Sequence, residues 1–69
     1  MKKVESSNIE AVGWHEGTLT VHFKNGSVYT YADVPKVEHD KLITARSVGG
    51  HFNAHIKGAY KHAKGENWR

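Results

Sequence analysis

The dipeptide Asn25-Gly26, between two stretches of alternating polar and apolar residues, is the feature that most restricts how this chain can fold. Both central residues of a type I′ turn need positive φ angles, which asparagine and glycine tolerate well, so this dipeptide is a strong β-hairpin signal. Residues 18–24 carry an apolar side chain at every second position, as expected of a strand with one buried face. These apolar residues are Leu19, Val21 and Phe23. The sequence therefore predicts a hairpin in which residues 27–32 return antiparallel to residues 18–24.

A two-residue turn also determines which residues face each other across the hairpin. It pairs His22 with Tyr29 and Thr20 with Tyr31, and such cross-strand partners project from the same face of a sheet. We therefore expect a mainly apolar core face, formed by Leu19, Val21, Phe23, Val28 and Thr30. The opposite face would carry Thr20, His22, Tyr29 and Tyr31. This tyrosine face could be an open binding platform or could be covered by a helix.

The residues around the hairpin predict one further strand and two helices. Residues 9–14 have the character of a first strand that ends in a turn at residues 15–17. Pro35 suits the first turn of a helix, which we expect over residues 35–46 with help from Asp33 as a cap. Ser47 is expected to be the N-cap of a second helix that ends at about Lys57 or Tyr60. The predicted fold class is thus α+β, a three-stranded antiparallel β-meander followed by two α-helices packed on the sheet.

The length of 69 residues allows a single domain with a small hydrophobic core. We expect the core to occupy about residues 4–60. Residues 61–69 are expected to form a basic loose tail or a frayed helical extension, in which Trp68 could dock. Because so small a core gains stability by association, a homo-oligomer is possible.

The sequence contains no cysteine, no apolar run long enough for a membrane helix, and no apolar segment behind Lys2 and Lys3 that would make a signal peptide. We therefore expect no membrane association. The expected location is the cytoplasm of a bacterium or of a phage-infected bacterial cell.

Positive charge is concentrated in the last third of the chain. From Arg46 onward there are five basic residues and one acid, Glu66, whereas five lysines are outnumbered by six acids before Arg46. Such an excess of lysine and arginine indicates a surface that contacts phosphate, either in nucleic acid or in a nucleotide. A solubilising surface with a basic tail would explain the same distribution equally well.

A possible anion site lies at the start of the second predicted helix. Its serine–glycine turn follows Arg46 and would present backbone N–H groups to a phosphate. Asn53 and Lys57 lie one turn apart on the same helix face, so both could reach one ligand, and a tyrosine ring could stack on a base. The candidate ligand-binding residues are Tyr29, Tyr31, Arg46, Ser47, Gly49, His51, Asn53 and Lys57. A helix cap and a tight turn between helices would account for the same serine and glycines without any ligand.

Several motifs, taken in order, resemble the KTSC domain family over about residues 4–60. They are Ser6-Ser7 with Ile9, Val12-Gly13-Trp14, Leu19-x-Val21-x-Phe23, Gly26, Tyr29-x-Tyr31, Val34-Pro35, Ala45-x-Ser47-x-Gly49 and Phe52-Asn53-x-x-Ile56. The Tyr-x-Tyr pair is the hallmark of this family, whereas Trp14 and His51 stand where we would expect tyrosine or another aromatic residue. The family is named for the C-terminal extension of some lysyl-tRNA synthetases and also occurs as small stand-alone bacterial and phage proteins. The resemblance implies three antiparallel strands followed by two helices, and it suggests RNA binding.

Neither a metal site nor catalysis is predicted. His51 and His55 are four residues apart and His62 follows, but the glutamate of a catalytic zinc helix is missing and no cysteine is present. The chain also lacks a nucleophile elbow and a phosphate-binding Walker loop. We therefore expect no cofactor and no enzymatic activity.

Three functions remain as hypotheses. The first is a nucleic-acid-binding module, most simply for RNA, that uses the basic surface and exposed aromatic residues. The second is a phage-type oligomeric protein that sequesters a nucleotide signalling molecule. The third is a structural or protein–protein interaction module anchored by Tyr29, Tyr31 and Trp68, because aromatic residues are enriched at interfaces.

Overall fold

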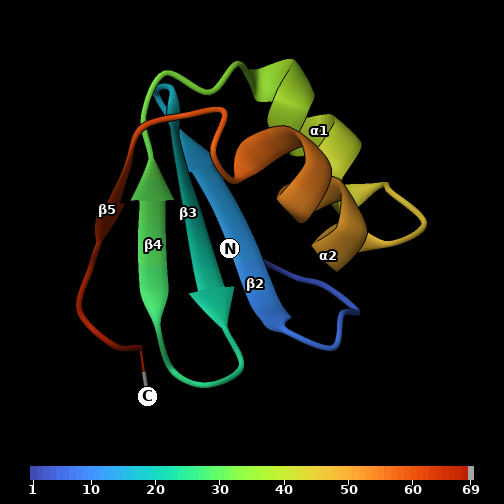
Figure 1. Cartoon of the computed structure of the whole chain (residues 1–69), viewed down its shortest axis with the longest axis vertical. Helices are drawn as coiled ribbons and strands as arrows, with labels where there is room; N and C mark the ends of the chain where they lie inside the picture. Colours follow the sequence, from blue (N-terminus) through green and yellow to red (C-terminus); the bar gives the residue numbers. More distant parts are fainter. Residues whose placement is uncertain (69) are drawn as a thin grey trace.

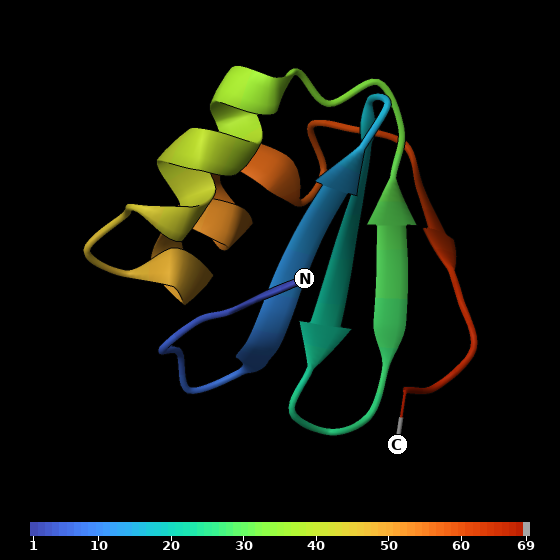
Figure 2. The same ribbon diagram turned by 180° about the vertical axis from the view of Figure 1, so that it is seen from behind.

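The structure, a computed structural model, describes residues 1–68 and contains one five-stranded antiparallel sheet. The strands follow in chain order across the sheet, namely β1 (Lys2–Lys3), β2 (Ile9–His15), β3 (Thr18–Phe23), β4 (Val28–Tyr31) and β5 (His62–Lys64). Three helical segments lie between β4 and β5 in the chain, namely α1 (Lys36–Ile43), α2 (Val48–His51) and the π-helical η1 (Phe52–Ile56). They cover one face of the sheet (Figures 1 and 2). The α+β class and the central antiparallel meander are confirmed.

The predicted number of strands was wrong, because the sheet has an additional strand at each edge. At one edge Lys2 pairs with Val12, and at the other His62 pairs with Tyr31. All residues of β1 and β5 are exposed, so neither strand has the alternation of polar and apolar residues that marks a half-buried strand. The expected loose or helical tail therefore contains a strand, and Arg69 lies outside the described residues.

The hairpin at Asn25-Gly26 is present, but its predicted register was wrong by one residue. Observed pairs include Val21 with Tyr29 and Leu19 with Tyr31. The loop has three residues, because the N–H of Phe23 donates to the carbonyl oxygen of Ser27 at 2.9 Å. Within this loop only Gly26 has a positive φ angle, of 98°, whereas a type I′ turn requires positive φ at both central residues.

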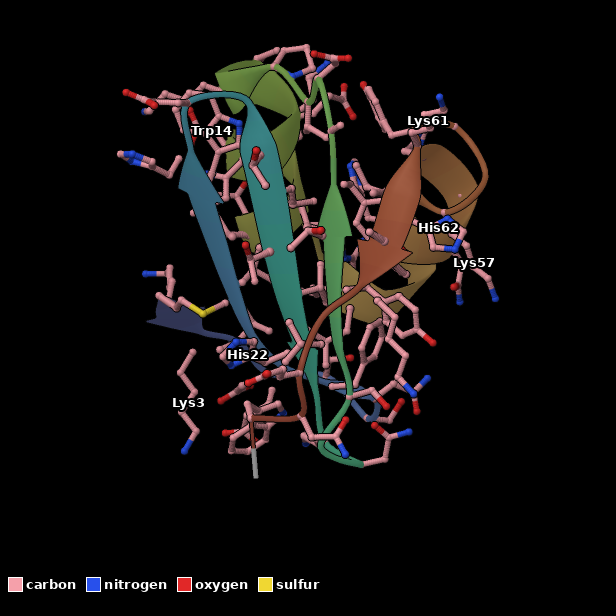
Figure 3. The ribbon with its side chains drawn as sticks, turned by 90° about the vertical axis from the view of Figure 1, so that its left-hand side faces the viewer. Lys3, Trp14, His22, Lys57, Lys61 and His62 are labelled. Atoms are coloured by element: carbon pink, nitrogen blue, oxygen red, sulfur yellow. The ribbon has the colours of Figure 1, made fainter. Side chains whose placement is uncertain are left out.

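A shift of one residue moves every side chain of a strand to the other face of the sheet. Tyr29 and Tyr31 therefore lie on the core face together with Leu19 and Val21, and not with His22. Val28 and Thr30, predicted to lie on the core face, pair with His22 and Thr20 on the opposite face. Figure 3 shows this opposite face toward the viewer, with the helical segments behind the strands.

Among residues 1–68, the turn between β2 and β3 is the one that has positive φ angles at two successive residues. Glu16 and Gly17 have φ angles of 46° and 85°, and His15 pairs with Thr18 across them. The carbonyl oxygen of Gly17 accepts a hydrogen bond of 2.9 Å from the N–H of Val34. This turn therefore also holds the chain that leaves β4.

Helix α1 is shorter than predicted and is not capped by Asp33. Pro35 is the N-cap and makes no side-chain capping bond, whereas Asp33 has a left-handed φ of 57° in the preceding loop. The indole Nε1 of Trp14 donates to the carbonyl oxygen of Val34 at 2.7 Å and ties this loop to β2.

The second helical segment begins as predicted, with Ser47 as its N-cap. The Ser47 Oγ accepts a hydrogen bond of 3.1 Å from the N–H of Gly50. The segment ends at Ile56 because Lys57 is extended, so Tyr60 lies beyond the helix but still packs at the edge of the core.

The core forms between the sheet and the helical segments. Its fully buried side chains are Ile9, Val12, Leu19, Val21, Val34, Leu42 and Ile56. Within residues 1–68 no helix is long and apolar enough to span a membrane.

Candidate functional site: an aromatic cleft

Five aromatic side chains form a closed circuit in which each ring contacts the next. Going round the circuit, the ring centroids are 5.7 Å apart from Phe23 to Tyr29, 5.9 Å from Tyr29 to His62, and 5.7 Å from His62 to Tyr31. They are 5.5 Å apart from Tyr31 to Phe52, and 5.7 Å from Phe52 back to Phe23. Three strands and η1 supply these rings. We call the cavity that they line, of about 830 Å³, the aromatic cleft.

Most contacts in the circuit are edge to face, with interplanar angles between 63° and 83°. This arrangement is favourable for aromatic quadrupoles and gives the cleft a pre-formed wall. Tyr31 and Phe52 are buried, Phe23 and Tyr29 are half-buried, and His62 is exposed. The circuit therefore runs from the core outward to the mouth of the cleft.

The tyrosine hydroxyls are available to a ligand. Within residues 1–68 neither hydroxyl makes a hydrogen bond, and neither is sealed from solvent. Burial raises the pKa of the Tyr31 hydroxyl, and the nearby Tyr29 raises it further. Tyr31 is therefore a neutral hydroxyl that can donate or accept a hydrogen bond over a wide pH range.

Side chains with amide or basic groups complete the cleft. Asn8, Asn25 and Asn53 line it, together with Lys24, Lys57 and His62. Among the described residues no aspartate or glutamate lines it. The cleft therefore combines aromatic faces, amides that can donate and accept hydrogen bonds, and a positive potential.

The other part of the predicted site forms a separate, smaller cavity next to the aromatic cleft. This serine hollow, of about 310 Å³, is lined by Arg46, Ser47 and Gly49, and by Ser6 of the loop before β2. Two of its three serines already accept hydrogen bonds, since the Ser6 Oγ accepts from the N–H groups of Asn8 and Ile9 at 3.3 Å, and the Ser47 Oγ caps α2. Asn53 lines both cavities.

The predicted site residues are thus divided between two adjoining cavities. Tyr29, Tyr31 and Lys57 line the aromatic cleft, whereas Arg46, Ser47 and Gly49 line the serine hollow. His51 lines neither cavity. Its ring lies 4.4 Å from that of His55, and its buried Nε2 has no hydrogen-bond partner within residues 1–68.

Three rings of the cleft were not predicted as site residues. Phe23 was predicted on the core face and Phe52 only as part of a family motif, and the correct hairpin register places Phe23 on the same face as Tyr29. His62 was considered only as a weak metal ligand. No sequence pattern indicates that it lies on a strand, because β5 is exposed throughout.

Comparisons with known proteins agree with this architecture. The chain is similar to a lysine–tRNA ligase of Nostoc punctiforme, with 43% identity over 86% of this chain. The match spans only 11% of that ligase. A protein of Tsukamurella paurometabola is 38% identical over 88% of this chain and 94% of its own length.

The solved structure of a KTSC domain protein from Yersinia pestis shows the same fold. It is 31% identical, covers 91% of this chain and 92% of its own, and superimposes with a TM-score of 0.87. The KTSC domain family also matches residues 5–60 directly. The chain belongs to the KTSC domain family.

Proposed function

We propose that this domain is a non-enzymatic RNA-binding module that takes one unpaired nucleotide into the aromatic cleft. The observation that carries the proposal is the closed circuit of five rings with Lys57 at the same cavity and no carboxylate among its described lining residues. Bases that are flipped out of a helix stack on aromatic side chains and are read by hydrogen bonds along their edges. Asn8 and Asn53 are suited to the edge of a base, and Lys57 is suited to its phosphate.

The mode of binding differs from that of an open sheet. In sheet-based readers several bases stack on exposed aromatic residues of one face. Here both tyrosines lie on the face that the helical segments cover, and the exposed side chains that line the cleft include Asn53, Lys57 and His62. This geometry favours a single nucleotide over a continuous strand of stacked bases.

The relatives support RNA as the source of the nucleotide. A similar domain is part of a lysine–tRNA ligase, and a tRNA offers unpaired nucleotides in its loops and at its end. Sequestration of a free nucleotide is the second candidate, because about 830 Å³ lies within the range of small-molecule pockets, about 300–1,000 Å³.

The test is a fluorescence-polarisation titration with labelled eight-nucleotide oligoadenylate and oligouridylate, with duplex RNA of the same length for comparison. We expect the single strands to bind more tightly than the duplex. Tyr29→Ala should weaken single-strand binding by about fivefold or more, since stacking of one base contributes about 1–3 kcal/mol. Val37→Ala, at an exposed position of α1 outside the cleft, is the control and should bind as the wild type does.

Titration of the unlabelled protein with AMP, UMP and cyclic nucleotides separates the two candidates. Tight binding of a free nucleotide without single-strand RNA binding would establish the second candidate. Equal affinity for duplex and single-stranded RNA, unaffected by Tyr29→Ala, would contradict a role for the aromatic cleft.

A further inference from the structure

We infer that His62 determines the ligand specificity of the aromatic cleft and that Trp68 is the positioning residue that holds it there. The inference rests on the proposed function, because it concerns the same cavity. Both residues lie outside the stretch that matches the KTSC family, residues 5–60. The proposed site thus includes residues that follow the stretch matched by the family model.

His62 closes the circuit of rings. It is the one member that contacts both tyrosines, at 5.9 Å from Tyr29 and 5.7 Å from Tyr31. Without it the remaining contacts would form an open chain in which Tyr29 and Tyr31 are the two ends. The outer wall of the cleft therefore depends on β5.

The position of His62 also suits direct contact with a ligand. Its side chain is exposed, it lines the cleft together with Lys57, and Figure 3 shows both side chains at the same edge of the sheet. An imidazole can stack on a base through its face and can hydrogen-bond a base or a phosphate through its ring nitrogens. His62 is thus the wall residue that can distinguish one base from another.

The segment that carries His62 is fixed to the sheet along its length. Before the strand, the N–H of Ala32 donates to the carbonyl oxygen of Lys61 at 2.9 Å. After it, the N–H of Gly65 donates to the carbonyl oxygen of Val28 at 2.8 Å. The backbone of β5 is therefore aligned with β4 at both ends.

Trp68 provides the last attachment. Its indole Nε1 donates to the carbonyl oxygen of Phe23 at 2.6 Å. Its backbone N–H donates to the carbonyl oxygen of Gly26 at 2.9 Å. Its ring stacks on His22, with centroids 5.7 Å apart and planes inclined by 6°. His22 lies on the sheet face opposite the cleft, and Trp68 does not line the cavity. Trp68 therefore supports the segment of His62 from outside the cavity, and it bonds the cleft residue Phe23 at the backbone carbonyl.

The experiment measures binding of oligoadenylate and oligouridylate to the full chain and to its variants. His62→Ala should weaken oligoadenylate binding by about fivefold or more, because one stacking ring is lost. His62→Phe should retain binding but change the ratio of the affinities for the two oligonucleotides, since the ring remains and its nitrogens are gone. His15→Ala, an exposed histidine at the β2–β3 turn, is the matched control and should leave both affinities unchanged.

A double-mutant cycle distinguishes positioning by Trp68 from a general loss of stability. Trp68→Ala should weaken binding in the wild-type background but add nothing in the His62→Ala background, because its effect passes through His62. The NMR chemical shifts of the Tyr29 and Tyr31 ring protons should change in the same direction in Trp68→Ala as in His62→Ala. Thermal unfolding confirms that each variant is folded at the temperature of the titration.

Failure of this inference differs from failure of the proposed function. If Tyr29→Ala weakens binding while His62→Ala and His62→Phe behave as the wild type, the cleft binds RNA without His62 and the inference is overturned. An additive effect of Trp68→Ala in the His62→Ala background overturns the positioning role. If the wild type binds neither oligonucleotide, the proposed function fails, and the inference fails with it.

Discussion

The ring of Tyr31 on β4 meets the ring of Phe52 in η1 edge to face, with centroids 5.5 Å apart and planes inclined by 79°. Both side chains are buried, so this contact belongs to the core as much as to the cleft. It joins the sheet to the helical segment whose Asn53 also lines the cleft. The shape of the aromatic cleft is therefore set by the same packing that stabilises the fold.

Phe52→Ala should largely unfold the domain. Replacing a buried phenylalanine by alanine costs about 3–5 kcal/mol, which is as much as the core of so small a domain supplies, about 3–5 kcal/mol. Far-UV circular dichroism during urea unfolding should show no folded baseline for the variant. Val37→Ala, at an exposed position of α1, should leave the wild-type midpoint unchanged. A cooperative transition of Phe52→Ala at that midpoint would show that the ring contact contributes little.

Alkaline pH should destabilise the wild type more than Tyr31→Phe. Burial, with a smaller effect from Tyr29, raises the pKa of Tyr31 in the folded state above the ordinary tyrosine value of about 10. Below about pH 10 the hydroxyl is protonated in both the folded and the unfolded state, and its contribution to the free energy of unfolding is fully present. As the pH rises through the folded pKa, the unfolded state loses its proton first and this contribution is lost.

The measurement is the free energy of unfolding at about pH 9 and about pH 11 for the wild type and Tyr31→Phe. The phenylalanine variant lacks this ionisation and should lose less stability over the interval, since all other titrating groups are common to both proteins. Tyr29→Phe should lower the pKa of Tyr31 part of the way toward the ordinary tyrosine value, because the smaller of the two effects that raise this pKa is then removed. Identical pH profiles for wild type and Tyr31→Phe would contradict the raised pKa.

The hairpin shows how far the sequence determines the fold. The alternation of Leu19 and Val21 predicted β3 correctly, because one face of that strand is buried in any register. The length of the turn was harder to predict, since Asn25-Gly26 is compatible with a two-residue loop and with a three-residue loop. Here the Oδ1 of Asn25 accepts a hydrogen bond of 2.9 Å from the N–H of Ser27, which favours the longer loop. That local choice reversed the faces of Tyr29 and Tyr31.

The candidate site was predicted in parts. Tyr29, Asn53 and Lys57 share one cavity, as the stacking hypothesis required, although the tyrosine reaches it from the opposite face to the one expected. His62 could not have been found, because its strand has no buried residue and is held by backbone hydrogen bonds and by Trp68. Edge strands of this kind leave no periodic pattern in a sequence.

Gly26→Ala should destabilise the hairpin by about 1–2 kcal/mol. Gly26 has a φ of 98°, and a side chain at a positive φ angle costs roughly 1–2 kcal/mol. Asn25→Ala, which removes the side-chain acceptor for Ser27 without changing the backbone requirement, should cost less, about 0.5–1.5 kcal/mol. Urea unfolding of both variants provides the comparison. A smaller loss for Gly26→Ala than for Asn25→Ala would argue against the three-residue loop.

Lys57→Ala should lower both the RNA affinity and its dependence on salt. Lys57 is suited to one phosphate, and about one phosphate contact contributes about −0.7 to the slope of log K against log salt for a single strand. This contribution corresponds to a fall of about 2.6-fold in affinity between about 50 and about 200 mM salt. Removing Lys57 should make the slope less negative by about 0.7, and the affinity for duplex RNA should change little. Lys61→Ala is the matched control, because Lys61 carries the same charge and is exposed but does not line the cleft.

Fluorescence polarisation at four salt concentrations measures the slopes of the wild type and of each variant. An equal reduction by the two substitutions would mean that the overall positive charge, and not the aromatic cleft, attracts the RNA.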